Sequence, residues 1–466
     1  MPVFDRQNRT KLDQLVQDFA DYKVNRRQFL QRAMAVGLSA GAATSLLEAC
    51  GGGSSGGGVN SSNPSKVTSI DALGVWSGEE LDSFNAINAA FTQKTGIKVN
   101  VEATRDLPTV LNTRVRGGNF PDVSGVPDVP TFQKLASQGK LLQLDKFFDM
   151  SYMQQNYNQF FINLASVNGH LYGVTPTANT KGTVWYSPKQ FQANGYTTPT
   201  DWNGLIALSS KIASSGKFPW SIGVESGAAS GWPAADWIDN IYLTTNGPDL
   251  SDMWVAHKIP WTHPTIKDAF QKFGQIVHGN HFVNGGAQAI LATNFQPASF
   301  LPFETPPKAY MYYLGDFTAG FIKAQFPNIK PGTDFNFFNF PASNPQFASA
   351  IIGGADMLMA FKDNDGTRQY MQFLSMPQAQ EIWVKRGGKS ATNKQVPASA
   401  YPDDVARNTA MQLINATTIR LSQDDSMPTA MESAYWKGTL SFIQSPSSLD
   451  SILSSLESTA VSVYGS

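Results

Sequence analysis

Patterns of strand, helix and strand alternate between residues 66 and 137, and this alternation restricts the possible folds more than any other feature of the chain. Residues 66–75 read as a strand. Apolar side chains then recur at helical spacing over 80–95, Gly96 ends that pattern, and 97–101 alternates as a second strand. A strand, a helix and a second strand within about 35 residues form a βαβ unit. We therefore predict an α/β fold with a largely parallel sheet.

The pattern continues after this unit, with a helix expected at 108–116, an extended segment at 122–126 and a helix at 129–137. In parallel α/β sheets, ligands bind in the crevice outside the carboxyl ends of the strands. Trp76 and Asp122 both fall where a strand meets a loop. We therefore expect both side chains at such a crevice.

The N-terminal part of the chain has the pattern of an export signal. Arg26 and Arg27 precede fifteen consecutive uncharged residues, 33–47, and together they resemble a twin-arginine signal peptide. As a helix the uncharged segment would extend about 22 Å, whereas the hydrocarbon core of a bilayer measures about 30 Å. The segment is therefore too short to span a membrane and is expected to direct export.

The single cysteine follows this apolar segment. Ala49 and Cys50 resemble the cleavage and lipidation positions of a bacterial lipoprotein signal, and 50–65 is rich in Gly and Ser. Such a run behaves as a flexible tether with a reach of roughly 20 Å. We predict a twin-arginine-type lipoprotein signal peptide at 1–49, lipidation of Cys50 and a tether at 50–65. The alternative is a short buried helix with a structural cysteine.

Charge and cysteine content exclude several classes of function. Lys and Arg number 35 and Asp and Glu number 36, so no basic excess exists to neutralise the phosphates of a nucleic acid. One cysteine excludes an intrachain disulfide, a zinc site built from several cysteines and a thiol redox pair. A chain with 15% charged residues and ten tryptophans is typical of proteins that bind a neutral polar ligand.

Sequence motifs give no sign of a cofactor or a metal ion. The chain has neither a G-x-x-x-x-G-K-[ST] phosphate loop nor a G-x-G-x-x-G dinucleotide motif. A G-x-S-x-G match at 37–41 lies inside the apolar signal segment rather than at a strand–turn–helix junction. His278 and His281 are three residues apart without an H-E-x-x-H motif, so we expect surface or capping roles for them. We predict no cofactor and no metal ion.

Seven of the ten tryptophans lie between residues 185 and 261. Three of them fall within helical or apolar patterns and are expected in the core, namely Trp202, Trp220 and Trp254. Small residues surround Trp232, and Asp236 directly precedes Trp237, which predicts an aromatic loop beside a carboxylate. This combination suits a sugar, because an indole stacks on the C–H face of a pyranose while a carboxylate accepts hydrogen bonds from hydroxyls.

Several segments resemble extracellular solute-binding proteins (family 1) of carbohydrate ABC transporters, the family that includes maltose- and α-glucoside-binding proteins. The segments are 168–186, similar to a crossover between lobes; 199–205, similar to a helix start in the second lobe; 335–341, similar to a hinge strand; 353–356, similar to a Gly-rich return; and 373–383, similar to a helix before the C-terminal bundle. The resemblance covers nearly all of 66–466. Likeness to the α-glucoside group rests on 178–182 (ANTKG) and 231–237 (GWPAADW).

This resemblance implies the two-lobed fold of type II periplasmic binding proteins, with hinge-connected lobes and a ligand cleft between them. We place the first lobe at 66–174 and 355–400 and the second at 178–350 and 405–466. The resemblance further implies a monomeric lipoprotein, not an enzyme, that captures a neutral sugar or oligosaccharide, with α-glucosides as candidates. The protein would be lipid-anchored at the outer face of the cell membrane and would deliver the sugar to permease subunits, with the ATPase in a separate cytoplasmic subunit.

The residues expected to bind the sugar come from both lobes. They are Trp76, Ser77, Glu79, Asp122, Asn179, Lys181, Trp232, Asp236, Trp237, Gly354, Asp356, Asp425 and Met427. Arg420 is expected to be either a ligand donor or an internal salt-bridge partner. Two other functions stay open. A secreted glycoside hydrolase needs two nearby carboxylates, and 36 acidic residues make some close pair certain. A structural or adhesive lipoprotein would instead grip a cell-wall polysaccharide.

Overall fold

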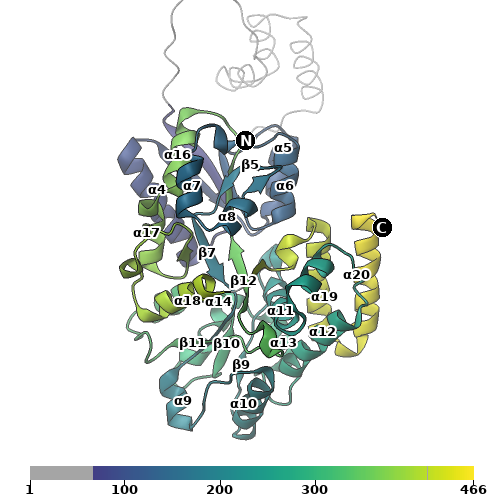
Figure 1. Ribbon diagram of the computed structural model, residues 1–466. Helices are drawn as coiled ribbons and strands as arrows, with labels where there is room; N and C mark the ends of the chain where they lie inside the picture. Colours follow the sequence, from purple (N-terminus) through teal and green to yellow (C-terminus); the bar gives the residue numbers. More distant parts are fainter. Residues whose placement is uncertain (1–66, 417, 466) are drawn as a thin grey trace, which may run out of the picture. The chain divides into compact units, whose positions relative to one another are not determined.

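A five-stranded sheet in the order β2-β1-β3-β13-β6 forms the centre of the first lobe of this computed structural model, which describes residues 67–416 and 418–465 (Figure 1). Its strands are β1 (Ser69–Gly74), β2 (Lys98–Ala103), β3 (Val123–Val126), β13 (Met357–Ala360) and β6 (Gly173–Val174). The signal peptide, Cys50 and the tether that the sequence predicts lie outside the described residues.

Helices cover both faces of this sheet. They are α4 (Gly78–Thr95), α5 (Leu107–Arg116), α6 (Val129–Ser137), α7 (Met150–Asn156), α8 (Gln159–Leu164), α16 (Asp365–Ser375) and α17 (Pro377–Arg386), with a small hairpin of β4 (Ser166–Val167) and β5 (His170–Leu171). Side chains alternate along β1, so that Ile70 and Ala72 pack with α4, α16 and α17, whereas Leu73 packs with α5 and α6. The strands and helices predicted between residues 66 and 137 are therefore confirmed, with ends that differ by at most three residues.

The prediction of a largely parallel sheet is wrong beyond the first three strands. β1 runs parallel to both β2 and β3, but β13 runs antiparallel to β3 and to β6. The reason is that β13 directly continues β12 (Ala350–Ala355), so the chain enters the first lobe from the hinge in the opposite direction. A βαβ pattern predicts only the strands that a crossover helix connects.

The second lobe is built on a four-stranded sheet in the order β11-β8-β10-β9. Its strands are β11 (Asn336–Asn339), β8 (Thr183–Tyr186), β10 (Met311–Tyr313) and β9 (Trp220–Ser221). Its helices are α9 (Pro188–Asn194), α10 (Trp202–Ser214), α11 (Trp232–Val255), α12 (Pro264–Val277), α13 (Gly286–Ala292), α14 (Phe295–Ala298), α15 (Thr318–Gln325), α19 (Thr429–Gln444) and α20 (Leu449–Tyr464). Segment 335–341, expected as a hinge strand, instead contains the edge strand β11 of this sheet. Trp202, Trp220 and Trp254 are buried in this lobe, as predicted.

A third sheet joins the lobes. Its order is β14-β7-β12-β15, with β14 (Ser390–Ala391), β7 (Thr177–Thr180), β12 and β15 (Thr418–Leu421), and α18 (Asp404–Asn415) packs beside it. Figure 1 shows β7 and β12 between the two helical groups. Both strands continue within a few residues into β6 and β13 of the first sheet. The chain thus crosses between the lobes on adjacent, hydrogen-bonded strands, which hold the two halves of the cleft in register.

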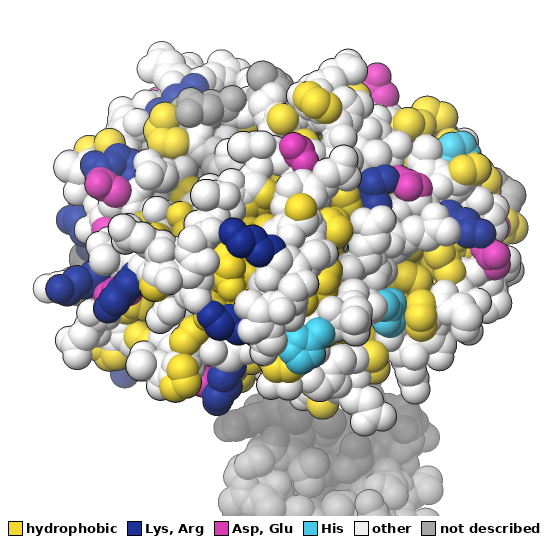
Figure 2. Space-filling model, turned by 90° about the horizontal axis from the view of Figure 1, so that it is seen from below, with side chains coloured by type: hydrophobic (Ala, Val, Ile, Leu, Met, Phe, Trp, Pro, Cys, Tyr) yellow, Lys and Arg dark blue, Asp and Glu magenta, His cyan; other side chains and the backbone are white. Residues whose placement is uncertain are grey.

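The surface matches the low charge of the sequence. On the face seen in Figure 2, basic and acidic side chains are interspersed among uncharged and hydrophobic ones, without a field of one sign. Arg420 lies 2.7 Å from Asp252 and forms an exposed ion pair with it, so it is a salt-bridge partner, although not an internal one. Among the described residues, no helix combines the length and the apolar character that crossing a membrane requires.

Candidate functional site

A cavity of about 360 Å³ lies between the lobes and is lined by residues of both. The first lobe contributes the segments that follow β1 and β2 and Pro127, which directly follows β3, and the crossing strands contribute Asn179 and Gly354. The second lobe contributes the starts of α11 and α19 and the turn at 424–426. The cavity therefore lies at the carboxyl ends of β1 and β2, where an α/β sheet is expected to bind its ligand.

Trp76 forms the wall of the cavity on the side of the first lobe. Its indole is 3% exposed, packs 4.1 Å from the ring of Phe84, and donates a hydrogen bond of 2.9 Å from Nε1 to Asp356. Two glycines make room for it, because a Cβ on Gly74 or Gly125 would lie 2.3 or 2.5 Å from the indole. Trp76 is thus a core residue that also presents a surface to the cavity.

Trp232 lines the cavity from the second lobe. Its ring lies 5.2 Å from that of Phe295 and 6.1 Å from that of Phe317, and the side chain is half-buried. Gly231, which precedes it, has a φ of 107°, and a Cβ there would meet the backbone oxygen of Trp436 at 2.6 Å. Only glycine allows α11 to begin this close to α19.

The segment around Trp232 and Trp237 is not the flexible loop that the sequence predicts. Both tryptophans belong to α11, which begins at Trp232 and is interrupted only at Gly247. The small residues favoured a loop interpretation, but Ala234 and Ala235 are buried where the helix packs into the core. Pro233 in the first helical turn is compatible with a helix start, since that turn has no hydrogen-bond partner for its N–H groups.

A buried lysine organises the floor of the cavity. Lys181 follows β7 and donates from Nζ to Asp236 at 2.8 Å, to Ser422 at 2.6 Å and to Asp425 at 3.3 Å. An ammonium group has three donors, and all three are used here. Lys181 therefore holds Asp425 at the cavity, while the fully buried Asp236 lies beneath it.

Burial has the largest single effect on the pKa values of Asp236, Asp425 and Lys181. Loss of hydration raises the pKa of Asp236 to about 6 and that of Asp425 to about 7, although the charge of Lys181 lowers both. Burial lowers the pKa of Lys181, but Asp236 and Asp425 oppose this strongly enough to hold it well above its ordinary value. The lysine is therefore charged at neutral pH, and the two carboxyl groups titrate close to neutrality.

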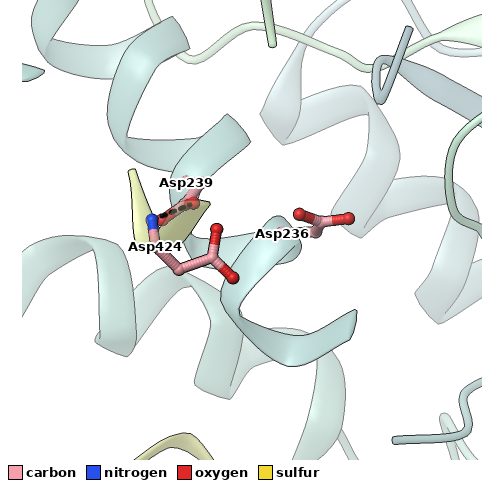
Figure 3. A group of neighbouring side chains, drawn as sticks. All are labelled: Asp236, Asp239 and Asp424. Carbon is pink, nitrogen blue, oxygen red and sulfur yellow. Dashed lines mark hydrogen bonds between the residues drawn. The ribbon is translucent and has the colours of Figure 1, made fainter. Parts of the chain in front are cut away.

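Asp236, Asp239 and Asp424 form a group in which one oxygen of each carboxylate lies within 4.8 Å of the others (Figure 3). Asp239 accepts hydrogen bonds from the Tyr435 hydroxyl at 3.0 Å and the Gln423 backbone at 2.8 Å. Asp424 accepts one from Nε1 of Trp436 at 2.8 Å. Because protein donors already engage Asp239 and Asp424, the geometry is that of an internal hydrogen-bond network rather than a set of free metal ligands.

A second buried lysine, Lys389, also lines the cavity. Lys389 approaches Glu80 at 3.1 Å and Asp356 at 3.8 Å, and it donates a long hydrogen bond of 3.5 Å to Oδ1 of Asn179. Asp356 is thus bound both by Lys389 and by the indole of Trp76. The polar rim of the cavity is fixed by these contacts before any ligand enters.

The structure brings about half of the predicted site residues to this cavity. Those that line it are Trp76, Asn179, Lys181, Trp232, Gly354, Asp356 and Asp425. Ser77 directly precedes α4, and Glu79 lies 3.5 Å from Arg386 at a second, smaller cavity. Direct contact of these residues with a sugar stays a prediction.

Asp122 lies away from the cavity. It precedes β3 rather than following it, so its side chain lies at the amino end of the sheet. Its Oδ2 accepts a hydrogen bond from the backbone of Asp71 at 2.8 Å, and Lys362 lies 3.5 Å away. The sequence showed a junction of strand and loop but not which end of the strand faces the ligand.

Trp237 and Met427 are also separated from the cavity, because both are buried in the core of the second lobe. Trp237 is 1% exposed and packs against Trp220, Tyr313 and Phe340. Five residues after Trp232 on the same helix, its side chain points about 140° away from that of Trp232. Met427 has no exposed surface.

Sequence reasoning missed several cavity residues. They are Glu80, Arg105, Phe317, Lys389, Glu432 and Trp436. Arg105 follows the carboxyl end of β2. Because ligands bind outside the carboxyl ends of parallel strands, the same argument that predicted Trp76 could have predicted Arg105. Its guanidinium donates to the backbone oxygen of Val75 at 3.0 Å and to Ser226 of the second lobe at 3.1 Å. The others are brought to the cavity by tertiary packing, for which the sequence gives no local signal.

The family model for bacterial extracellular solute-binding proteins matches residues 86–412. The osmoprotective compounds-binding protein GgtB of Synechocystis is 33% identical over 387 residues, covering 83% of this chain and 90% of the relative. The alpha-glucosides-binding periplasmic protein AglE of Rhizobium meliloti is 31% identical over 396 residues, covering 83% and 85%.

Solved structures share the fold. The solute receptor AcbH, described as having an exclusive preference for β-D-galactopyranose, matches with a TM-score of 0.75 and 20% identity, covering 85% of this chain and 99% of that one. MalE3 of T. maritima with bound maltose matches with a TM-score of 0.68 and 16% identity, covering 84% and 98%. The fold is therefore the two-lobed α/β fold of type II periplasmic binding proteins, as the resemblance implied.

Proposed function

The chain belongs to the bacterial extracellular solute-binding protein family, and from this premise we propose that it is the substrate-binding subunit of an ABC importer for a neutral sugar or oligosaccharide. The observation that carries the proposal is that one indole from each lobe, Trp76 and Trp232, lines the same cavity together with the polar side chains of Asn179, Asp356 and Asp425. Aromatic rings stack on the C–H faces of a pyranose, and the carboxylate and amide oxygens accept hydrogen bonds from its hydroxyl groups.

The size of the cavity favours a short ligand. Its volume of about 360 Å³ lies near the lower end of the roughly 300–1,000 Å³ that ligand pockets occupy. We therefore expect one or two sugar units in the enclosed part. The relative named for α-glucosides supports small glycosides as candidates.

Ligand-induced changes in melting temperature test the proposal. At a concentration one hundred times its Kd, a ligand that binds only the folded state adds about 2.7 kcal/mol of stability. A panel of neutral mono- to tetrasaccharides should contain members that raise the melting temperature, whereas acyclic polyols of matched concentration should not. A panel in which no sugar has an effect would contradict sugar capture.

The proposal includes a first lobe at 66–174 and 355–400 and a second lobe at 178–350 and 405–466. It also includes delivery of the bound sugar to the permease subunits. A sugar held by both lobes stabilises the closed arrangement, and closure would create the surface that the permease subunits recognise. ATP hydrolysis is assigned to a separate cytoplasmic subunit. The protein would act as a monomer at the outer face of the membrane.

We expect that Cys50→Ala abolishes stable membrane anchoring while leaving the protein folded. Hydrocarbon burial contributes about 0.8 kcal/mol per CH₂, and stable anchoring needs more than one chain, so losing the lipidated residue should release the protein. Fractionation of cells measures the result. A Cys50→Ala protein that is processed yet still firmly bound to the membrane would contradict the lipoprotein hypothesis.

Export by the twin-arginine route has a separate test in the same cells. Changing Arg26 and Arg27 to Lys keeps the charge but removes the arginine pair, so export should be impaired. Unchanged export would assign the protein to the general secretion pathway and leave the lipid anchor unaffected.

We expect no hydrolysis of aryl glycosides or oligosaccharides. Asp236 is fully buried and hydrogen-bonded to Lys181, and it is not among the residues that line the cavity. Product release should therefore equal the buffer background for the wild type and for Asp236→Asn. Turnover in the wild type that Asp236→Asn abolishes would instead identify a glycosidase.

A further inference from the structure

The end of the cavity formed by α19 contains a carboxyl group without a partner. Glu432 is 3% exposed and lines the cavity, yet its carboxyl takes part in no hydrogen bond or ion pair with any residue that the structure describes. Its oxygens are not among the fully enclosed side-chain atoms that lack a partner, so they open onto the cavity. Buried carboxyl groups usually have a partner, and we expect a ligand in the cavity to provide one for Glu432.

Other acidic groups surround Glu432. Asp128 of the first lobe and Asp424 and Asp425 of the second are the charges that raise its pKa, after the larger effect of burial. Asp128 is itself held across the cleft, because its Oδ2 accepts a hydrogen bond from Thr429 at 3.0 Å. Both lobes thus place carboxyl groups at the same end of the cavity, and burial together with this crowding favours the protonated form of Glu432 as long as no cation is near.

The positive charge available at this end does not balance these acids. Lys181 is the cation that opposes them, but its ammonium is already bonded to Asp236, Ser422 and Asp425. Lys437 also lines the cavity, but its side chain is exposed to solvent. A neutral ligand would bring no additional cation to the carboxyl groups at this end of the cavity.

An aromatic side chain completes the arrangement. Trp436 lies one helical turn after Glu432 on α19 and lines the same cavity. Its Nε1 is anchored on Asp424, which fixes the orientation of the indole. A fixed indole beside carboxylates is an environment that stabilises a cation, through the negative face of the ring.

We propose that Glu432, with Trp436 and the neighbouring carboxylates, forms a subsite for a protonated amine, so that the cavity prefers glycosides carrying an amino group over their neutral counterparts. The inference rests on the proposed capture of a sugar and names the kind of substituent that the α19 end recognises. An ammonium group would donate a hydrogen bond to Glu432, which has no partner among the described residues, and its positive charge would favour the ionised carboxylate.

Isothermal titration of the purified protein tests the preference. The probes are maltose and trehalose together with derivatives in which one hydroxyl at a time is replaced by an amine. Hydrogen bonds to charged groups lead us to expect that at least one amino derivative binds about ten- to a hundredfold tighter than its neutral parent. If no amino derivative binds tighter than its parent, the subsite is overturned, and this comparison needs only the wild type.

The variant Glu432→Gln locates the effect. It should remove most of the advantage of the amino derivative while changing the affinity of the neutral parent much less. Glu381→Gln on α17, which removes a carboxylate paired with Lys385 outside the cavity, should leave the advantage unchanged. An advantage that survives Glu432→Gln would overturn the assignment to α19. Failure of every neutral sugar to bind would overturn the proposed function instead, so the two failures are distinguishable.

Discussion

Replacing Lys181 by methionine should lower the free energy of unfolding by about 3–5 kcal/mol, the cost of removing one partner from a buried ion pair. Lys181 is the cation bonded to both Asp236 and Asp425, and Asp236 has no exposed surface. Methionine fills a similar volume, so the effect reports lost charge rather than a cavity. Denaturant unfolding of the two proteins at neutral pH measures it.

The pH dependence separates this cause from a packing defect. Asp236 and Asp425 have raised pKa values in the folded state, so stability falls as pH rises from the unfolded value near 4 through about 6 to 7. Without Lys181 the folded pKa values rise further, and this decline extends to higher pH. The difference in stability between wild type and Lys181→Met should therefore grow from mild acid to mild alkali.

Two comparisons complete the test. Lys437→Met removes an exposed lysine that lines the same cavity and should change stability by less than about 0.5 kcal/mol. Adding Asp236→Asn to Lys181→Met removes the buried carboxylate that has lost its cation. The double variant should therefore recover part of the lost free energy of unfolding. A loss in Lys181→Met that is the same at every pH would show that packing, not charge, is responsible.

Local patterns predicted the elements of the first lobe well because each is determined by nearby residues. The helix of α4 follows from apolar spacing and from Gly96, which ends it with a φ of 77°. The buried Trp202, Trp220 and Trp254 follow from their apolar surroundings. Trp76 was found because the carboxyl end of a strand is a ligand-binding position in any parallel sheet.

Other features depend on tertiary packing. The direction of β13 is set by the crossing between lobes, which no short segment encodes. Asp236 was expected at the ligand because it precedes an aromatic residue, yet it lies under Lys181, which is 55 residues away in sequence. Glu432 and Trp436 reach the cavity because α19 packs against α11, and nothing in their own segment indicates this contact. Fold and family were therefore predictable, whereas the inner geometry of the site was not.

Trp232→Ala and Trp237→Ala should separate sugar binding from folding, although the two tryptophans lie five residues apart on α11. Stacking contributes about 0.5–1.5 kcal/mol beyond burial, and covering roughly 50 Å² of apolar surface adds about 1.2 kcal/mol. Together these amount to about 1.7–2.7 kcal/mol, so Trp232→Ala should weaken sugar binding by roughly fifteen- to ninetyfold. Trp237→Ala removes a core indole and should cost about 3–5 kcal/mol of stability.

Calorimetric titration and thermal melting of the same two variants measure both effects. Trp237→Ala should bind sugar with nearly normal affinity at temperatures where it remains folded, because its ring packs on Trp220 and Tyr313 rather than on the cavity. Trp76→Ala should show both defects, since this indole packs on Phe84 and also lines the cavity. A Trp232→Ala protein that melts far below wild type yet binds sugar normally would mean that the second wall of the binding site lies elsewhere.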